Sequence, residues 1–387
     1  MVRLFLTLAY TALLVPGRTL RAGRIRARPI WFDSLGAKSA CLLVETPDLS
    51  LLIDPGAAAL QPSFPLPPER KEELRSLAYR AIEAAASRAD AIAITHYHYD
   101  HHVRFDFPVD ARAIYEGKVI WAKDPNCYIN KSQWERARIL FGQMCSELAD
   151  LELEELLMPP ARRSFEDPVA DLRLALERNF GDYQARREEL LVKGRMWFEK
   201  LASTLWARKP WLPNELELGK TRVEFVDGQE REVGRTLLRF EGPFFHGVEY
   251  DRVGWVLSVV VEHGGAKLIY SSDLQGPIIE DYAAWLVRED PDLLVLDGPP
   301  TYLLGYMLNK TNLARAVENI CLIVHEVRAD PIILDHHLLR DTRYRERLAP
   351  AYETAREAGK RLLTAAEWLG REPVALSVAR EKAPASD

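Results

Sequence analysis

A short apolar run followed by a dense cluster of histidines constrains this chain more than any other feature. Residues 91–94 read Ala-Ile-Ala-Ile, a pattern typical of a strand that is buried on both faces. The next eight residues are Thr95, His96, Tyr97, His98, Tyr99, Asp100, His101 and His102, so four of the nine histidines fall within seven positions. A loop at the end of a rigid strand holds its side chains in place, and imidazoles with a carboxylate on such a loop predict a metal site.

The spacing within this cluster predicts ligands for two metal positions. His96 and His98 can point to one side of an irregular loop, and Asp100 and His101 follow where a helix is expected to begin. Neutral imidazoles with a carboxylate and no thiolate suit zinc, manganese or iron(II). The alternative is a histidine-rich surface tract that binds metal adventitiously. That alternative would require neither the preceding strand nor the distant histidines.

Composition and charge are those of an ordinary globular protein. A chain of 387 residues with 48% hydrophobic and 28% charged residues suits one large domain or two modest ones. The net charge of −6 argues mildly against a nonspecific grip on nucleic acid, which needs a basic face, although a local basic groove is compatible with it. The cysteines lack CxxC spacing, and we interpret them as reduced thiols of a cytoplasmic protein: Cys41, Cys127, Cys145 and Cys321.

The first 28 residues are expected to lie outside the fold. Residues 4–15 are apolar but too few to span a bilayer as a helix, so we predict no membrane span. The arginines that follow oppose export: Arg18, Arg21, Arg24, Arg26 and Arg28. A surface anchor on a membrane is the alternative for this extension.

The remaining pattern predicts an α+β fold in two β-rich halves. The first half has a hairpin over residues 39–45 and 49–54, a helix over 69–88 and a strand over 118–122. The second half has strands over 221–226, 235–241, 253–262, 267–272, 293–296 and 331–334, with helices over 278–287, 312–327 and 343–358. Two such halves, each followed by helices, fit a four-layer αββα sandwich.

A helical insertion is predicted over residues 132–212, between a first part of the domain over 29–131 and a second part over 213–387. Ser132, with Glu135 three residues later, is expected to cap its first helix. Trp197, Trp206 and Trp211 indicate either a packed interface or a lid over the site. In either case the insertion is expected beside the cleft, where it would influence substrate choice.

The motif HxHxDH after a buried strand resembles the signature of the metallo-β-lactamase-fold hydrolases. The phrases THYHYDHH, INKSQ, LDGPPTYL and DHHLLRD make the stretch from about Pro29 to Trp368 similar to an archaeal subgroup of that superfamily. The resemblance implies the αββα sandwich and a metal-dependent hydrolase. The motif is specific for fold and metal binding and says little about the substrate.

The resemblance also implies which residues bind metal. The first metal would take His96, His98 and His246, the second would take Asp100, His101 and His336, and Asp273 would bridge both. From the residues alone, His246 beside two phenylalanines could be a core histidine, and Asp273 at a strand end could cap a turn. His337 is the alternative to His336, because side chains alternate along an extended chain and both rings cannot then point into the site.

Further residues are predicted to support these ligands. The resemblance implies that Asp54 hydrogen-bonds the histidine loop, and Asp297 could hold a histidine tautomer, although either could be an ordinary turn residue. Asp100 would also steer the nucleophile. His102 would either donate a proton to the leaving group or support a neighbouring ligand.

Two divalent metal ions follow from the resemblance, with zinc expected and manganese or iron as alternatives, and a hydroxide between them as the nucleophile. We expect the substrate to be a phosphodiester or another anionic ester, either a small molecule, a nucleotide or RNA. A lactone, thioester or amide hydrolase is the first alternative. An iron-dependent oxidoreductase and a non-catalytic scaffold are the others, and the filled ligand positions argue against the last. The sequence does not indicate an oligomeric state.

Overall fold

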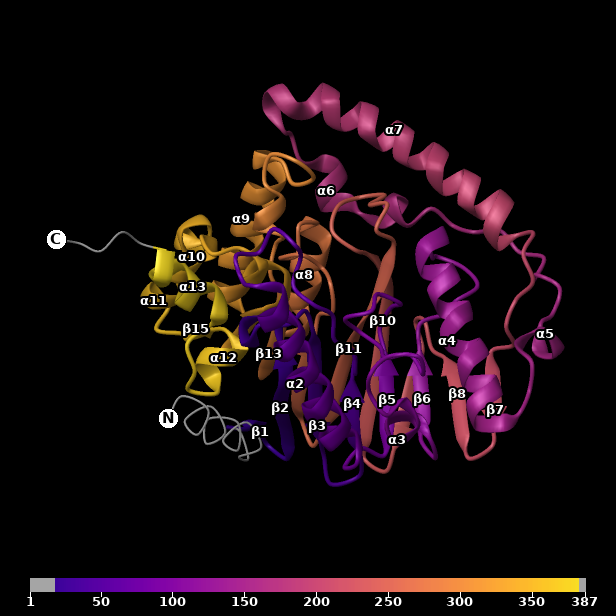
Figure 1. Cartoon of the computed structure of the whole chain (residues 1–387). Helices are drawn as coiled ribbons and strands as arrows, with labels where there is room; N and C mark the ends of the chain where they lie inside the picture. The colour runs from indigo at the N-terminus through magenta and orange to yellow at the C-terminus, as the bar shows by residue number, and fades with distance from the viewer. Residues whose placement is uncertain (1–17, 383–387) are drawn as a thin grey trace, which may run out of the picture.

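Two β-sheets lie face to face in the computed structural model, which describes residues 18–382. Helices cover the outer face of each sheet, so the chain forms a four-layer αββα sandwich (Figure 1). The predicted fold class is therefore confirmed.

The first sheet has eight strands, of which the predicted hairpin forms the middle. Its spatial order is β1 (Leu20–Ala22), β2 (Ile25–Phe32), β3 (Ala40–Glu45), β4 (Ser50–Ile53), β5 (Ala91–Ile94), β6 (Val119–Ala122), β8 (Thr221–Phe225) and β7 (Glu215–Leu218). Strands β4, β5, β6 and β8 are parallel neighbours. Their carboxyl ends therefore lie at one edge of the sheet.

The second sheet has seven strands. Its spatial order is β15 (Leu362–Leu363), β14 (Ile332–Asp335), β13 (Leu293–Asp297), β12 (Ala266–Tyr270), β11 (Trp255–His263), β10 (Thr236–Phe245) and β9 (Glu230–Val233). Strands β12, β13 and β14 are parallel. Because β11 is antiparallel to both β10 and β12, strand β10 runs in the same direction as these three.

The core between the sheets follows from the period-two alternation of the strands. Leu42 and Val44 of β3 belong to the apolar cluster between the sheets, whereas Leu43 belongs to the cluster beneath the helices. On the second sheet, Val259 of β11 faces inward and Val260 faces the helices. Strands that are apolar on both faces are expected where both faces are covered.

Helices α2 (Pro68–Ala86) and α3 (Ala111–Tyr115) cover the first sheet, and α8 (Glu280–Glu289), α9 (Lys310–Glu326) and α11 (Ala349–Glu357) cover the second (Figure 1). The shorter elements are η2 (Asp33–Leu35), η6 (Thr301–Leu303), η7 (His336–Arg340), α10 (Tyr344–Arg347), α12 (Ala365–Trp368) and α13 (Val374–Lys382). Helix α2 shows why the pattern was predictable, since Leu74, Leu77 and Ile82 recur at helical spacing and are buried.

The segment between β6 and β7 is helical, as predicted. It contains α4 (Lys131–Ala149), α5 (Leu153–Leu156), η3 (Pro168–Asp171), α6 (Arg173–Glu177), η4 (Gly181–Tyr183), α7 (Gln184–Leu201) and the π-helix η5 (Ala202–Trp206). Helix α7 runs across the top of the molecule in Figure 1. The predicted cap at Ser132 is wrong. Asn130 caps α4, because its side chain accepts a hydrogen bond of 2.7 Å from Gln133 N.

Trp197 and Trp206 of this segment pack against Trp255 of the second sheet. Trp206 is fully buried, and its Nε1 donates to Ile129 O at 2.9 Å. Trp197 stacks on Trp255 of β11 with ring centroids 5.5 Å apart and an interplanar angle of 1°. The lid role of the insertion and its domain bounds at 132 and 212 stay predictions.

The expectation that residues 1–28 lie outside the fold is wrong for residues 20–28. Leu20 pairs with Ala27, so β1 and β2 form a hairpin at the edge of the first sheet. Ile25 and Ala27 are buried and alternate with exposed or half-buried arginines, and that alternation of apolar and arginine residues is the strand signal. Residues 1–17 lie outside the described residues.

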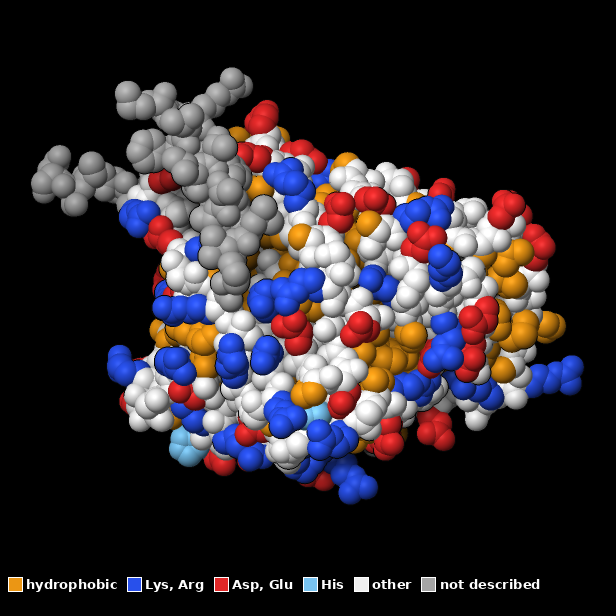
Figure 2. Space-filling model, turned by 90° about the horizontal axis from the view of Figure 1, so that it is seen from below, with side chains coloured by type: hydrophobic (Ala, Val, Ile, Leu, Met, Phe, Trp, Pro, Cys, Tyr) orange, Lys and Arg blue, Asp and Glu red, His pale blue; other side chains and the backbone are white. Residues whose placement is uncertain are grey.

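Surface and thiol chemistry are unexceptional in the described part of the chain. Among residues 18–382, no helix combines the length and the apolar character that crossing a membrane requires. The four cysteines are free thiols. On the face seen from below, Lys and Arg side chains are interspersed with Asp and Glu wherever described residues are visible (Figure 2).

Candidate metal centre

The histidine loop and the later acidic and histidine motifs meet at the carboxyl ends of the strands. Strand β5 leads into residues 95–102 and β10 leads into His246. In the second sheet, β12 is followed by Asp273, and β14 by His336 and His337. A hydrogen bond of 3.1 Å from Leu257 N to Thr95 O joins the two sheets at this edge. The order and direction of the strands thus bring together residues up to 241 positions apart, from His96 to His337.

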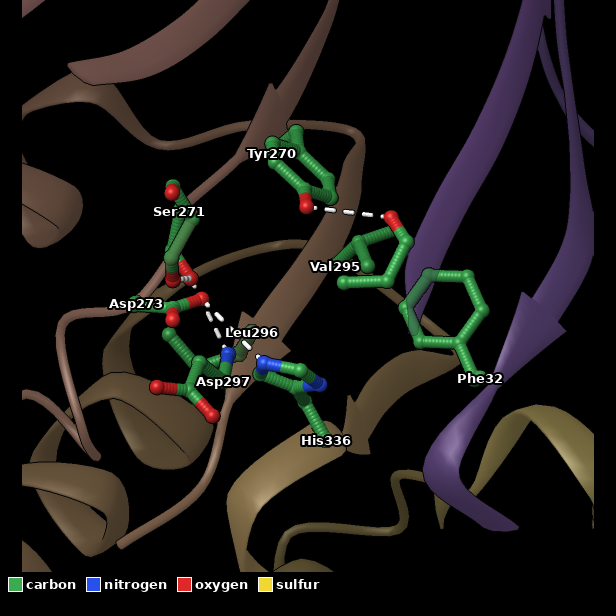
Figure 3. Close-up of a pocket in the computed structure, with 10 residues that line it drawn as sticks. Phe32, Tyr270, Ser271, Asp273, Val295, Leu296, Asp297 and His336 are labelled. Atoms are coloured by element: carbon green, nitrogen blue, oxygen red, sulfur yellow. Dashed lines mark hydrogen bonds and ion pairs between the residues drawn. The ribbon is translucent and has the colours of Figure 1, made fainter. Parts of the chain in front are cut away.

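Asp273 lies at the centre of this group. Its two carboxylate oxygens are buried and accept no hydrogen bond. The imidazole Nε2 atoms surround them, with Oδ2 3.0 Å from His246, 3.2 Å from His101, 3.3 Å from His96 and 3.9 Å from His337, and Oδ1 3.4 Å from His336. Figure 3 shows Asp273 and His336 facing each other. Buried polar atoms without partners are costly, and a divalent cation would satisfy these.

One group of four side chains fits the first metal position. The candidate ligand atoms of His96, His98, His246 and Asp273 all lie within 4.8 Å of one another. His96 Nε2 and His98 Nδ1 are 3.0 Å apart. The Nε2 atom of His246 is buried without a hydrogen-bond partner. Three imidazoles and one carboxylate are a suitable donor set for zinc.

Two overlapping groups lie at the second position, one of Asp100, His101 and His336 and one of Asp273, His336 and His337. The expectation that only one of the two adjacent histidines can face the site is wrong. Strand β14 ends at Asp335, and His336 has a φ of 67°, so the chain is not extended there and both rings face Asp273. Asp335 holds this turn by accepting hydrogen bonds from the backbone N of His336 and Ser34.

A carboxylate stands behind each of three candidate ligands. His101 Nδ1 lies 2.8 Å from Asp54 Oδ2, His336 Nδ1 lies 2.8 Å from Asp33 Oδ1, and His337 Nδ1 lies 3.0 Å from Asp297 Oδ1. When a metal ion is bound, such a partner would keep the proton on Nδ1 and leave the Nε2 lone pair to the metal, which is the arrangement of metal-binding histidines. The structure therefore places Asp54 and Asp297 where the sequence predicted supporting residues.

Asp54 also fixes the start of the histidine loop. It is fully buried and accepts hydrogen bonds from Thr95 N at 2.8 Å, Thr95 Oγ1 at 2.7 Å and Tyr270 OH at 2.8 Å. The loop passes so close to Gly56 that a methyl group there would lie 2.2 Å from His102 N and 2.5 Å from His101 N. Only glycine allows this approach.

His102 lies outside the three groups of candidate ligand atoms among the described residues. Its ring packs against Tyr97 and Tyr99 with centroids 6.1 and 5.7 Å apart, and both of its ring nitrogens are buried without a hydrogen-bond partner. Burial lowers the pKa of His102 to about 3, so the ring is neutral at physiological pH. Its role in proton transfer or ligand support stays a prediction.

Sequence reasoning missed Asp33 and Arg340. The Arg340 side chain is 6% exposed; its Nε donates to Asp33 Oδ2 at 2.6 Å and its Nη2 donates to Asp100 Oδ2 at 2.8 Å. Burial alone would raise the pKa of Asp100, but the charges of His101 and Arg340 hold it well below its usual range. The available signal was an arginine in the apolar sequence that follows His337.

His96 and His101 differ in charge despite lying side by side. Burial and the neighbouring His101 lower the pKa of His96 to about 4, so its imidazole is neutral and free to coordinate. Burial alone would also lower the pKa of His101, but the carboxylates of Asp273 and Asp54 raise it to about 10 in the chain without metal. A metal ion that binds His101 must therefore displace a proton.

Among solved structures, the fold is similar to a putative metal-dependent hydrolase from Parabacteroides distasonis, with a TM-score of 0.39, 10% identity and coverage of 90% of this chain and 97% of that one. It is also similar to CmlA, a diiron β-hydroxylase from Streptomyces venezuelae, with a TM-score of 0.38, 13% identity and coverage of 84% and 51%. At these TM-scores neither likeness bears on activity.

The comparison with related sequences shows which family the chain belongs to. The family model described as the metallo-β-lactamase superfamily matches residues 36–102, which end in the histidine loop. The UPF0282 protein of Methanopyrus kandleri is 33% identical over 366 residues, covering 92% of this chain and 98% of that protein. The UPF0282 protein of Korarchaeum cryptofilum is 29% identical over 359 residues, covering 92% and 93%. The chain belongs to the UPF0282 family, an archaeal subgroup of the metallo-β-lactamase superfamily.

Proposed function

We propose that this protein is a metal-dependent hydrolase that cleaves a phosphodiester or another anionic ester. The observation that carries the proposal is Asp273, a buried carboxylate with five imidazole Nε2 atoms around it. In the chain without metal, protonated histidines such as His101 balance its charge, and a divalent cation bound by the same imidazoles would take the place of those protons.

The proposed centre has two metal positions. The first would use His96, His98, His246 and Asp273, and the second would use Asp100, His101 and His336, with His337 as a further candidate. Zinc suits this donor set, and manganese or iron are the alternatives. Divalent ions bound here would supply Lewis-acid chemistry, lowering the pKa of water toward neutrality and polarising the ester.

Basic side chains near the centre support an anionic substrate. Lys38 is half-buried and lies close enough to Arg340 and Asp100 for their charges to act on it. Arg136 is half-buried over the Tyr99 ring, 4.5 Å from its centroid, and its charge acts on His98. Guanidinium and ammonium groups at the edge of a metal site favour phosphate or carboxylate groups on the substrate. A small phosphodiester, a nucleotide and RNA all share that chemistry.

The test compares bis-p-nitrophenyl phosphate with a lactone as substrates of the purified protein, supplied in turn with zinc, manganese or iron(II). We expect phosphodiester turnover that falls more than about hundredfold in His246→Ala, because a ligand is lost rather than an outer partner. The matched control is His325→Ala, since His325 is exposed on α9 and its ring pairs with Glu326.

Lactone cleavage without phosphodiester cleavage would reject the anionic ester. Oxygen consumption with iron alone, and no hydrolysis with any metal, would reject hydrolysis in favour of an oxidoreductase.

A further inference from the structure

We infer that Arg340 competes with a metal ion for the second position, so that the two metal positions of this chain differ widely in affinity. The inference rests on the proposed metal centre but does not depend on which ester is cleaved.

The guanidinium uses the same atoms that a second metal would need. Arg340 Nη2 lies 2.8 Å from Asp100 Oδ2 and 3.3 Å from His336 Nε2. The Nδ1 atom of His336 lies 2.8 Å from Asp33 Oδ1, so Nε2 is the nitrogen that a metal ion would use, and this nitrogen faces the guanidinium. In the second group, Asp100 therefore already pairs with a cation, and His336 lies against the same guanidinium.

Arg340 is held firmly in this place. Its Nε donates to Asp33 Oδ2 at 2.6 Å, and its backbone oxygen accepts from Gln61 Nε2 at 2.8 Å. Asp33 is 1% exposed, so withdrawal of the guanidinium would leave a buried carboxylate without its charged partner. An arginine cannot lose its proton in a protein, so a metal ion that enters the second position meets a fixed positive charge.

The first position has no such competitor among the described residues. Within residues 18–382, no arginine or lysine donates to His96, His98, His246 or Asp273. The Nε2 of His246 and both oxygens of Asp273 have no hydrogen-bond partner. The first position is therefore prepared for a metal ion, whereas at the second position a metal ion must displace Arg340 from Asp100 and from its place beside His336 Nε2.

The experiment titrates chelator-stripped protein with zinc against a chromophoric chelator and measures retained zinc by mass spectrometry after dialysis. In the wild type we expect one retained ion per chain and a second that binds at least about a hundredfold more weakly. Arg340→Gln should tighten the second ion by about tenfold or more, because the competing charge is gone. Arg340→Lys keeps a positive charge and should leave the second ion weak.

The matched control is Arg343→Gln, because Arg343 is an exposed arginine three residues along that pairs with Glu346, and it should change neither affinity. If Arg340→Gln fails to fold, Asp33→Asn combined with Arg340→Gln removes both buried charges together. Wild-type protein that retains two ions with similar affinity overturns the inference and leaves the hydrolase intact. Protein that binds no divalent ion at all overturns the proposed function as well.

Discussion

Replacing Asp54 by asparagine should weaken metal binding and destabilise the fold by similar free energies. The Asp54 carboxylate accepts from His101 Nδ1 at 2.8 Å, so when a metal ion displaces one proton of His101, the remaining proton stays on Nδ1 and the lone pair is on Nε2. The amide nitrogen of an asparagine facing His101 donates, so Nδ1 must accept and the proton moves to Nε2. That proton points at Asp273 Oδ2, 3.2 Å away, and blocks coordination.

The expected magnitudes follow from the contacts. Loss of an outer partner costs about tenfold to a hundredfold in metal affinity, or roughly 1.4 to 2.7 kcal/mol. The effect on folding is of similar size. Thr95 N can still donate to the asparagine oxygen, and the hydroxyls of Thr95 and Tyr270 keep other partners in Ser272 Oγ at 2.7 Å and Ala40 O at 3.0 Å. Asp54 Oδ2 accepts three hydrogen bonds, and the one from His101 Nδ1 has no substitute acceptor, so its loss amounts to about 1.5 to 3 kcal/mol of unfolding free energy.

Zinc competition with a chromophoric chelator measures the first quantity, and urea unfolding of chelator-treated protein measures the second. The control is Asp90→Asn, because Asp90 is an exposed carboxylate on the same sheet that accepts from Ser50 N at 2.9 Å. Unchanged zinc affinity in a folded Asp54→Asn protein would refute the reasoning from the His101 tautomer.

Three other perturbations give distinct results. Gly56→Ala should lose about 1 to 3 kcal/mol of unfolding free energy, because its methyl group meets the backbone of the histidine loop, and it should also retain less zinc. An unchanged midpoint of thermal unfolding together with an unchanged zinc content would contradict this. Trp206→Ala should lose about 3 to 5 kcal/mol in urea unfolding, because Trp206 is fully buried, while the folded fraction keeps its zinc. The pKa of His101 is about 10 in the folded chain without metal and about 6.5 when unfolded, because the carboxylates of Asp273 and Asp54 outweigh burial. Its stabilising contribution is complete below pH 6.5 and is lost as the pH rises through 10, so the unfolding free energy of chelator-treated protein should fall over that range, and should fall less in His101→Gln.

The strand ends were the predictable part of the site. The apolar run at 91–94, the strand before Asp273 and the strand before His336 each carry a local signal, and local periodicity decides such elements. The resemblance then related these segments to one another. The structure places all seven predicted ligand side chains in the groups around Asp273.

Residues whose role depends on long-range contacts were not predictable. Asp33 and Arg340 are 307 positions apart, and neither follows a motif that periodicity can identify. The left-handed backbone of His336 also has no local signal, because the residue is not glycine or asparagine and the turn is imposed by Asp335, whose side chain accepts from Ser34 N and Ala365 N on distant segments. The strand over 25–32 was missed although the alternation of apolar and arginine residues is a local signal, because the arginines were interpreted as part of a charged extension.

Anomalous X-ray diffraction at the zinc edge, from crystals grown with zinc, tests the central claim most directly. We predict a strong peak enclosed by His96, His98, His246 and Asp273, whose candidate ligand atoms already lie within 4.8 Å of one another. The absence of a peak at these four side chains, in crystals that show zinc bound elsewhere on the chain, would contradict the account.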